Sequence, residues 1–234
     1  MDKMTVAHLK QAAAEKAVEA VHSGMVVGLG TGSTAVFMVR AIGQLLQDGR
    51  LQHILGIPTS EATAREAERV GIPLTTLNEH PVIDVTIDGA DEISPQLDLI
   101  KGLGGALLRE KIVATASRRM IVVGDGSKKV ARLGTRAPLP VEVIPFAQGP
   151  VQAYLASLGA RPVLRVHNGV TFITDEGNII LDCHFDEGID DPELIGQAIR
   201  QQPGVVEHGL FLGLAETAVV ATNDTIEVLG KRLS

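Results

Sequence analysis

The sequence predicts an α/β protein, in which a Rossmann-like, mostly parallel sheet domain carries an inserted smaller α+β domain of ferredoxin-like order. Helix and strand patterns alternate up to Val123, and such a βαβ series forms a parallel sheet with helices on both faces. After Lys128 prolines punctuate the chain, and the patterns follow the split βαβ order. We expect the first domain to comprise 1–133 and 212–234, and the second to comprise 134–211.

The first domain opens with apolar residues at helical spacing, which predict a helix over 9–20, followed by a buried strand over 25–29. Thr59 and Ser60 carry hydroxyls that can accept the amide hydrogens of a first helical turn, so a helix is expected from there to Val70. The other elements expected are helices over 33–46 and 105–117, and strands over 53–57, 74–77, 83–87 and 120–123.

The second domain begins with a strand, a helix and a further strand. The elements expected in order are strand 141–144, helix 148–158, strands 161–166 and 178–183, helix 192–201 and strand 205–211. Two short tail strands, over 218–221 and 225–229, enclose a turn at 222–224. We expect them to return to the first sheet, which makes the second domain an insertion.

The composition argues against nucleic acid and membrane as partners. The chain has 21 basic and 28 acidic residues, a net charge of −7, and no long basic run to face a phosphate backbone. Nothing approaches the roughly 20 consecutive apolar residues of a bilayer-spanning helix. Residues 1–4 lead into a polar stretch without the apolar core of a signal segment, and a single cysteine cannot form an internal disulfide. These features predict a cytoplasmic protein.

The glycine-rich segment 28–34 lies where the first strand ends and a helix begins, at the usual ligand-binding edge of an open α/β sheet. Its amides and hydroxyls suit an anion and predict a site for a single phosphate. A plain glycine turn with a hydroxyl cap would explain the same residues. A dinucleotide site is disfavoured because Ser33 takes the third glycine position and no acidic residue lies near 51–53. The candidate phosphate-binding residues are Thr31, Gly32, Ser33 and Thr34.

Three carboxylates, Asp88, Asp91 and Glu92, lie within five residues at the end of a later strand. They repel one another unless they face different partners, and sugar hydroxyls are suitable partners. A solvated turn would explain the same residues. No metal site is expected, because no histidine is near and the spacing of a calcium loop is absent.

Lys101 and the glycine-rich loop after it open the helix that carries Glu110. The loop amides can surround an oxyanion, the lysine adds a charged donor, and a glutamate inside a helix is held rigidly enough to act as a base. A charged helix face is the plain alternative for Glu110. Lys128 follows the strand 120–123 and is either a phosphate ligand or a surface lysine. The combination predicts an enzyme that acts on a small sugar phosphate.

The remaining residues with reactive side chains show no pattern of a site. The seven histidines are scattered without ligand spacing, and we interpret them as structural or exposed. Cys183 falls in a predicted strand, where a small buried apolar residue is expected rather than a nucleophile.

Several segments occur in the same order in one known family. They are 30–34, 59–60, 85–92, 101–106, 109–111, 127–128 and 138–143, with 204–206 and 209–211 near the second junction. Any one of them is a weak signal, but the ordered set is specific, and the chain closely resembles the ribose-5-phosphate isomerases of type A. One departure is Leu103, where the family more often has glycine, and it concerns the shape of that loop.

The resemblance implies a metal-free and cofactor-free aldose–ketose isomerase of the non-oxidative pentose phosphate pathway. It would interconvert D-ribose 5-phosphate and D-ribulose 5-phosphate through an enediolate, as a homodimer or homotetramer. The implied catalytic residues are Glu110, which carries the proton between C1 and C2, Asp88, Asp91 and Lys101. The implied substrate-binding residues are Thr31, Gly32, Ser33, Thr34, Asp88, Gly89, Ala90, Asp91, Lys101, Gly102, Leu103, Gly104 and Lys128, with Lys10 a further candidate.

Two other kinds of protein are consistent with the fold. A non-catalytic sugar-phosphate-sensing domain of a transcription regulator is one, because fold alone does not separate binding from catalysis. The lack of a basic helix-turn-helix segment before Thr5, and the presence of Glu110 and Lys101, disfavour it. A dehydrogenase is the other, and Ser33 with the missing acidic residue disfavours it.

Overall fold

The computed structural model describes residues 5–233, and these form two compact units. Unit 1 comprises the described residues up to Ala90, Arg109–Lys128, and the described residues from Gly213 onward. Unit 2 comprises Asp91–Leu108 and Lys129–Leu212. Residues 1–4, where the sequence predicts no signal segment, lie outside the described part of the chain.

The expected domain limits and these units differ in the placing of a few segments. Residues 91–108 and 129–133 and Leu212 belong to unit 2, although the sequence patterns place them in the first domain. The segment 91–108 carries short strands that pair with a strand from the end of unit 2, and that pairing has no counterpart in local sequence pattern.

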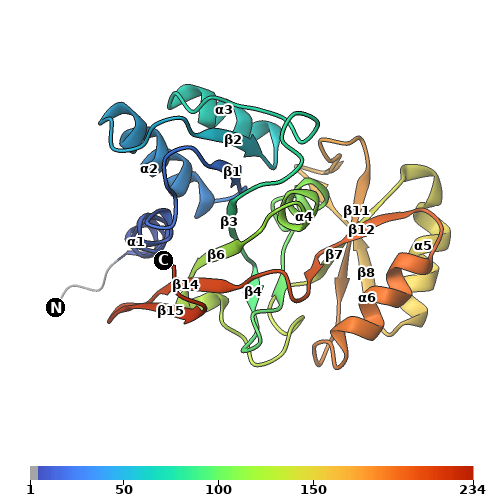
Figure 1. Ribbon diagram of the computed structural model, residues 1–234. Helices are drawn as coiled ribbons and strands as arrows, with labels where there is room; N and C mark the ends of the chain where they lie inside the picture. The colour runs from blue at the N-terminus through green and yellow to red at the C-terminus, as the bar shows by residue number, and fades with distance from the viewer. Residues whose placement is uncertain (1–4, 234) are drawn as a thin grey trace. The chain divides into compact units, whose positions relative to one another are not determined.

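Unit 1 contains a six-stranded sheet that is parallel except at one edge (Figure 1). From edge to edge its strands are β15 (Ile226–Gly230), β14 (Thr217–Ala221), β6 (Met120–Asp125), β3 (Val85–Gly89), β1 (Val26–Leu29) and β2 (Leu55–Pro58). Only the pair of β14 and β15 is antiparallel. The tail strands therefore return to this sheet, as the sequence predicts.

Helices lie on both faces of this sheet (Figure 1). On one face α1 (Val6–Val18) packs against α2 (Ala35–Gln47), and α3 (Glu61–Arg69) packs beside α2. On the other face lies α4 (Leu107–Thr115), whose Val113 shares a small buried cluster with Ile57 and Ile83. The predicted cap of α3 is confirmed, because the Ser60 hydroxyl accepts a hydrogen bond from Thr63 N at 3.1 Å.

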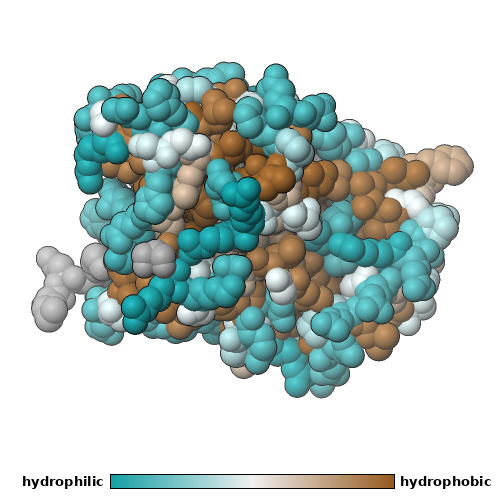
Figure 2. All heavy atoms as spheres, viewed as in Figure 1, coloured by the Kyte–Doolittle hydropathy of each residue, from teal (hydrophilic) through white to brown (hydrophobic). Residues whose placement is uncertain are grey.

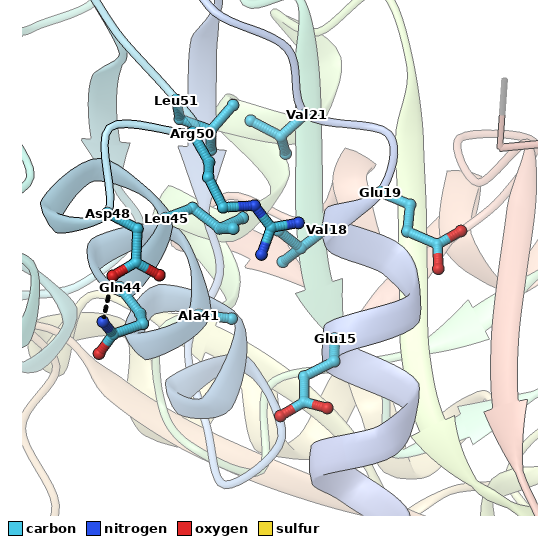
Figure 3. Close-up of a pocket in the computed structure, with 10 residues that line it drawn as sticks. All are labelled: Glu15, Val18, Glu19, Val21, Ala41, Gln44, Leu45, Asp48, Arg50 and Leu51. Atoms are coloured by element: carbon cyan, nitrogen blue, oxygen red, sulfur yellow. Dashed lines mark hydrogen bonds between the residues drawn. The ribbon is translucent and has the colours of Figure 1, made fainter.

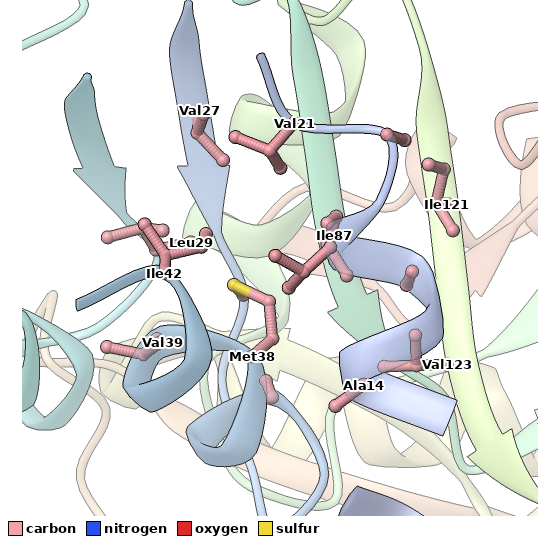
Figure 4. Packing of buried hydrophobic residues seen from close by; sticks show 14 of the residues in the cluster. Ala14, Val21, Val27, Leu29, Met38, Val39, Ile42, Ile87, Ile121 and Val123 are labelled. Atoms are coloured by element: carbon pink, nitrogen blue, oxygen red, sulfur yellow. The ribbon is translucent and has the colours of Figure 1, made fainter. Parts of the chain in front are cut away.

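The core of unit 1 lies between the strands and the pair α1 and α2 (Figure 4). Met38 and Ile42 of α2 and Ala14 of α1 point toward the strand residues Leu29 and Ile87, and all five side chains are fully buried. Burying an aliphatic side chain of this size contributes roughly 1.5–3 kcal/mol. This packing holds the strands, and hence the loops at their ends, in fixed positions.

Unit 2 contains a four-stranded antiparallel sheet in the order β12-β7-β11-β8. Its elements along the chain are β7 (Leu139–Val143), α5 (Gln148–Ser157), β8 (Arg161–Leu164), β11 (Ile179–His184), α6 (Pro192–Gln201) and β12 (Val205–His208). This is the predicted split βαβ order. Alternate residues of β7 and β11 pack with Val151 of α5 and Ile199 of α6 in one buried cluster.

The outward surface of α6 is mainly hydrophilic (Figure 2). Ile199 and Gly196 on the same helix are buried, so α6 is amphipathic and covers the sheet with its apolar face. No helix formed by residues 5–233 is long and apolar enough to cross a bilayer.

The structure also contains short strands and single-turn helices that the sequence does not predict. A three-stranded sheet joins β13 (Leu210–Phe211), β5 (Leu99–Ile100) and β4 (Glu92–Ile93), and β9 (Val166–His167) pairs with β10 (Val170–Thr171). The single-turn 3₁₀ helices are η1 (Gly126–Lys128) in unit 1 and η2 (Pro145–Ala147) in unit 2. A strand of two residues is too short to show the alternation of apolar and polar residues that predicts a strand.

Two strand predictions need correction. The strand expected over 74–77 is wrong, because Leu74 makes only a single parallel bridge to Gly56 and the next residues turn, with Thr75 Oγ1 donating to Glu79. Threonine hydroxyls that bind nearby groups favour turns over ladders. The strand expected over 205–211 is two strands, because Gly209 separates β12 from β13.

Candidate active site

Loops from four parallel strands meet at one edge of the unit 1 sheet. Because β2, β1, β3 and β6 run in the same direction, their carboxyl ends lie together, where parallel sheets bind ligands. These ends carry the predicted residues Thr31–Thr34, Asp88–Ala90 and Lys128. The structure therefore places these three groups of predicted residues at one edge.

The loop between β1 and α2 presents amide groups to solvent. Gly32 has a φ of +111°, a left-handed conformation that glycine adopts without strain. The amides of Gly32, Ser33 and Thr34 donate to no acceptor among residues 5–233, and they lie at the N-terminus of a 13-residue helix. Amides left in this position attract an anion, so the loop fits a phosphate group.

Thr31 is held within the protein by both of its polar groups. Its amide donates to Asp88 Oδ1 at 3.0 Å, and its hydroxyl lies 2.7 Å from Thr59 Oγ1 and 2.8 Å from Ser60 Oγ. Thr63 Oγ1 lies 3.0 Å from the same hydroxyl. This cluster of hydroxyls fixes the loop to the start of α3, so Thr31 shapes the loop that carries the amides of Gly32, Ser33 and Thr34.

Lys10 reaches the same loop from α1. Its Nζ donates to the Ser33 hydroxyl at 2.8 Å. The ammonium group thus lies beside the amides that could bind a phosphate, where its charge would attract the same anion.

Asp88 is fully buried at the end of β3. Its Oδ1 accepts hydrogen bonds from Thr31 N at 3.0 Å and from Gly89 N at 2.7 Å. A side chain on Gly30 would place its Cβ only 2.2 Å from Asp88 Oδ1, so glycine is required where β1 passes this carboxylate. The two amide donors and the close backbone of Gly30 hold the Asp88 carboxylate in one orientation.

Glu110 lies in the first turn of α4 and is 4% exposed. The end of α4 lies at the start of β3, because Ile83 N donates to Ala116 O at 2.9 Å. Further back along the helix, Val113 contacts β1, since a Cβ on Gly28 would lie 2.7 Å from Val113 Cγ1. Glu110 is one turn nearer the helix N-terminus on the same face. Its side chain therefore faces the sheet near the edge that carries the glycine-rich loop and Asp88.

Lys128 ends the short helix η1 after β6 and is partly exposed. The turn before it is held by Asp125, whose Oδ1 accepts a hydrogen bond from Ser127 N at 2.9 Å. Asp125 is 5% exposed and closes the loop in the manner of an Asx turn. The turn therefore fixes the backbone of Lys128, while its long side chain extends to solvent.

The other predicted residues belong to unit 2. Lys101 is 2% exposed, its amide donates to Gly209 O at 2.9 Å, and its Nζ lies 5.4 Å from the centre of the Phe211 ring. Asp91 Oδ2 accepts a hydrogen bond from Leu103 N at 2.9 Å. A buried lysine over an aromatic face and a carboxylate tied to the adjacent loop form an ordered polar group.

The loop after Lys101 tolerates Leu103. The left-handed positions are Gly102, with a φ of +105°, and Gly105, with a φ of +86°, whereas Leu103 has an ordinary negative φ. The Leu103 side chain is 42% exposed and needs no space inside the protein. The departure from the more usual glycine therefore does not strain the loop.

Two further residues of unit 2 have structural roles. Glu142, in the segment 138–143, is buried and accepts hydrogen bonds from Thr174 Oγ1 and Asn178 Nδ2, both at 2.9 Å. Burial raises the pKa of the Glu142 carboxyl above its ordinary value. Cys183 is fully buried as expected, and burial raises the pKa of its thiol to about 12, which removes it as a nucleophile at neutral pH.

A surface hollow of about 580 Å³ lies in unit 1 away from these residues (Figure 3). Val18 and Leu45 form part of its apolar lining, and no predicted site residue lines it. Its charged side chains are Glu15, Glu19, Asp48 and Arg50. Three carboxylates against one guanidinium would repel a sugar phosphate, so this hollow is not a candidate substrate site.

Several residues that hold the candidate site in shape could not be found in the sequence. The hydroxyls of Thr59 and Thr63 lie about 30 residues along the chain from Thr31, and Phe211 lies far from Lys101 in sequence. Of these residues, only Thr59 is detectable in the sequence, because the Thr59-Ser60 pair predicts a helix cap. No group of three or more His, Cys, Asp or Glu side chains in the described part of the chain could hold a metal ion.

Comparison with known proteins gives a family match over most of the chain. The family described as ribose 5-phosphate isomerase A (phosphoriboisomerase A) matches residues 55–225. The ribose-5-phosphate isomerase A of Roseiflexus castenholzii is 58% identical over 218 residues, which cover 93% of each chain.

Solved structures give the same result. The ribose 5-phosphate isomerase of Plasmodium falciparum has a TM-score of 0.94 and 42% identity, covering 97% of this chain and 99% of that one. A D-ribose-5-phosphate isomerase in complex with phospho-erythronic acid also has a TM-score of 0.94, with 38% identity, covering 97% of this chain and all of that one. With a family match over most of its length and close relatives along nearly all of it, the chain belongs to the ribose 5-phosphate isomerase A family.

Proposed function

We propose that the protein interconverts D-ribose 5-phosphate and D-ribulose 5-phosphate by moving one proton through an enediolate, with Glu110 as the base. Ribose-5-phosphate isomerase A activity in the pentose phosphate pathway follows from family membership. The proposal adds the mechanism and the residues. The observation that supports it most is the buried carboxylate of Glu110, which faces the sheet edge that carries Asp88 and the exposed loop amides.

Proton transfer between adjacent carbons requires a base and a means to stabilise negative charge. In the aldose-to-ketose direction, Glu110 removes the proton from C2 of the open-chain sugar. The electron pair moves into the C1 carbonyl and leaves an enediolate with its charge on O1. Glu110 then returns the proton to C1, and the hydroxyl proton on O2 passes to O1 as the C2 carbonyl forms. Asp88 assists ring opening and this hydroxyl proton transfer.

The remaining residues bind the substrate and stabilise the negative charge of the enediolate. Lys101 and the amides of 102–104 stabilise the charge on the enediolate, and Asp91 binds sugar hydroxyls. Gly89 and Ala90 line the sugar beside Asp88. Gly32, Ser33 and Thr34 hold the phosphate with Lys128 and Lys10, while Thr31 keeps their loop in shape. The hydrogen bond of Lys10 to Ser33 supports the last of these assignments.

We also propose that the reaction needs neither metal nor cofactor, since a carboxylate base with a lysine and amide donors covers the chemistry. The family resemblance further suggests a homodimer or homotetramer in the cytoplasm, and light scattering at micromolar concentration would measure the assembly. A monomer at those concentrations would contradict that part of the proposal.

The first test follows the proton. Chelator-treated protein is incubated with ribose 5-phosphate in heavy water, and NMR measures ketose formation and deuterium at C1 of the ketose and at C2 of recovered aldose. Glu110→Gln should lower kcat by about 10²–10⁴-fold, the usual contribution of a general base. Glu193→Gln is the matched control, an exposed first-turn glutamate of α6.

Two results would contradict the proposal. Absence of ketose in the chelated wild type would refute the metal-free isomerisation. Full activity in Glu110→Gln would refute the assignment of the base, because an amide cannot accept the proton.

A further inference from the structure

One arginine of unit 2 holds the carbonyl groups of the loop that follows Lys101. Arg165 Nη1 donates to Gly102 O at 2.8 Å and to Leu103 O at 3.1 Å. Arg165 lies between β8 and β9, and its own amide donates to Ile180 O at 2.9 Å. A residue more than 60 positions along the chain therefore determines the direction of two consecutive peptide groups in this loop.

The guanidinium group is itself held in place. Asp182 on β11 accepts hydrogen bonds from Arg165 Nε at 2.9 Å and from Nη2 at 2.5 Å, and the two side chains are 10% and 17% exposed. The guanidinium carbon lies 5.8 Å from the centre of the Phe172 ring. A fork-shaped pair between a guanidinium and a carboxylate fixes the plane of the arginine.

Phe172 also limits the loop at its far end. A Cβ on Gly105 would lie 2.4 Å from Phe172 Cζ, so this ring and the loop backbone are in close contact. The amide of Phe172 donates to Arg165 O at 3.0 Å. Arg165 and Phe172 thus form one rigid support beneath residues 102–105.

The direction of the carbonyls decides the direction of the amides. In a trans peptide the N–H points opposite to the C=O, and the described chain has no cis peptide. Gly102 O faces Arg165, and the N–H of the same peptide, on Leu103, donates to Asp91 Oδ2 at 2.9 Å on the other side. Leu103 O also faces Arg165, so the Gly104 N–H points to the side of Asp91. Gly104 is exposed, and its amide has no acceptor among residues 5–233.

We infer that Arg165 is a positioning residue for the isomerisation: it turns the Gly104 amide toward the charge that forms on the substrate. The inference rests on the proposed role of this loop in stabilising the enediolate. Without the guanidinium, the two carbonyls lose their common donor and the peptide groups can rotate. Asp182 and Phe172 act through Arg165 and are not expected to touch substrate.

The test separates positioning from folding. Arg165→Ala alone leaves the Asp182 carboxylate in a poorly hydrated position without its partner, which destabilises the protein whatever the role of the loop. The decisive variant is therefore the double substitution Arg165→Ala with Asp182→Ala, which removes both charges. Arg132→Ala is the matched control, because Arg132 forms an exposed ion pair with Asp190 in the same unit, at 2.6 Å.

We expect the double variant to lower kcat for ribose 5-phosphate by about 10- to 100-fold, since slight misplacement of reacting groups can cost that much. The KM should change less than about twofold, because the phosphate-binding loop of unit 1 is untouched. Added guanidinium ion should recover part of the kcat lost in Arg165→Ala, and Arg132→Ala should equal the wild type. A double variant with wild-type kcat, or one that changes only KM, would overturn the inference.

A second measurement does not depend on turnover. The amide hydrogens of Leu103 and Gly105 donate to Asp91 Oδ2 and to Gly102 O. Their exchange should be faster in the double variant than in the wild type, and unchanged in Arg132→Ala. Unchanged exchange at Leu103 and Gly105 would also overturn the inference. If the wild type itself formed no ketose, the proposed function would fail, and the exchange result alone would decide whether Arg165 orders the loop.

Discussion

At the scale of single residues, Gly30 and Asp88 are in close contact in the candidate site. The carboxylate is fully buried, and two backbone amides donate to it. These contacts are available only because β1 and β3 approach each other without a side chain on Gly30. The glycine and the carboxylate are therefore one structural feature, although 58 residues separate them in the chain.

Gly30→Ala tests this feature. The added Cβ would lie 2.2 Å from Asp88 Oδ1 and 2.5 Å from Asp88 Cα, so backbone must move. Overpacking of this kind costs about 1–3 kcal/mol of unfolding free energy, and the displaced carboxylate should lower kcat/KM as well. Urea unfolding and initial rates measure the two effects. Gly149→Ala in α5 is the control, since no atom lies within 4 Å of its new Cβ, and a wild-type result for Gly30→Ala would refute the close approach.

At the scale of elements, an ion-pair cluster joins α2 to α3. Glu66 Oε1 of α3 lies 2.6 Å from Arg40 Nε of α2 and 2.7 Å from Arg69 Nη2. Hydrogen bonds from Arg69 and Arg40 lower the pKa of the Glu66 carboxyl from 4.5 to about 2. The cluster therefore favours the ionised glutamate in the folded protein.

The direction of this pKa change decides the pH range over which Glu66 stabilises the folded protein. Because the folded pKa of Glu66 is below its unfolded value, the stability it contributes is complete above pH 4.5 and is lost as the pH falls toward 2. Both arginines are more than half exposed, so the contribution at pH 7 should be only about 1 kcal/mol. Glu66→Gln should lose this amount at pH 7 and match the wild type near pH 2, in urea unfolding at several pH values.

Glu68→Gln, on the same helix and exposed, is the control and should follow the wild type throughout. An equal loss of stability in Glu66→Gln at all pH values would show that the effect is not linked to ionisation.

Elements differ in how well sequence predicts them. The helix over 192–201 and the tail strands follow from long apolar periodicity and clear turns. The short strands β4, β5 and β13 do not, because strands of two residues show no periodicity. The pairing of β13 with β5 also joins segments about 110 residues apart. The error at 74–77 arose from an apolar pattern that local threonine hydrogen bonds override.

At the scale of the whole molecule, the tail completes the sheet of unit 1. β14 lies beside β6 in parallel register, and Ala218, Val219 and Val220 are fully buried. Strands from early and late parts of the chain are thus neighbours in this sheet. In the sequence, the two segments of unit 2 lie between segments of unit 1.

Removal of residues 213–234 tests the role of the tail. The truncated chain would expose the apolar strand β6 as a sheet edge, which favours association with other chains. It would also lose the buried side chains of β14, whereas a typical domain is stable by only roughly 5–15 kcal/mol in total. We expect insoluble protein without a cooperative unfolding transition by circular dichroism. Asp224→Ala, in the exposed turn between β14 and β15, is the control and should fold like the wild type. A soluble, cooperatively unfolding product after the truncation would contradict this assignment.

The sequence by itself determined the α/β fold with its parallel and antiparallel sheets, and it predicted the groups of residues to which we assign the chemistry. Both follow from local information: periodicity sets helices and strands, and glycine, carboxylate and lysine motifs lie at strand ends within a few residues of each other. Tertiary structure alone decided which groups hold those motifs in shape. Arg165, Asp182 and the hydroxyls around Thr31 reach the loops through contacts between distant segments, and packing creates such contacts without leaving a pattern along the chain.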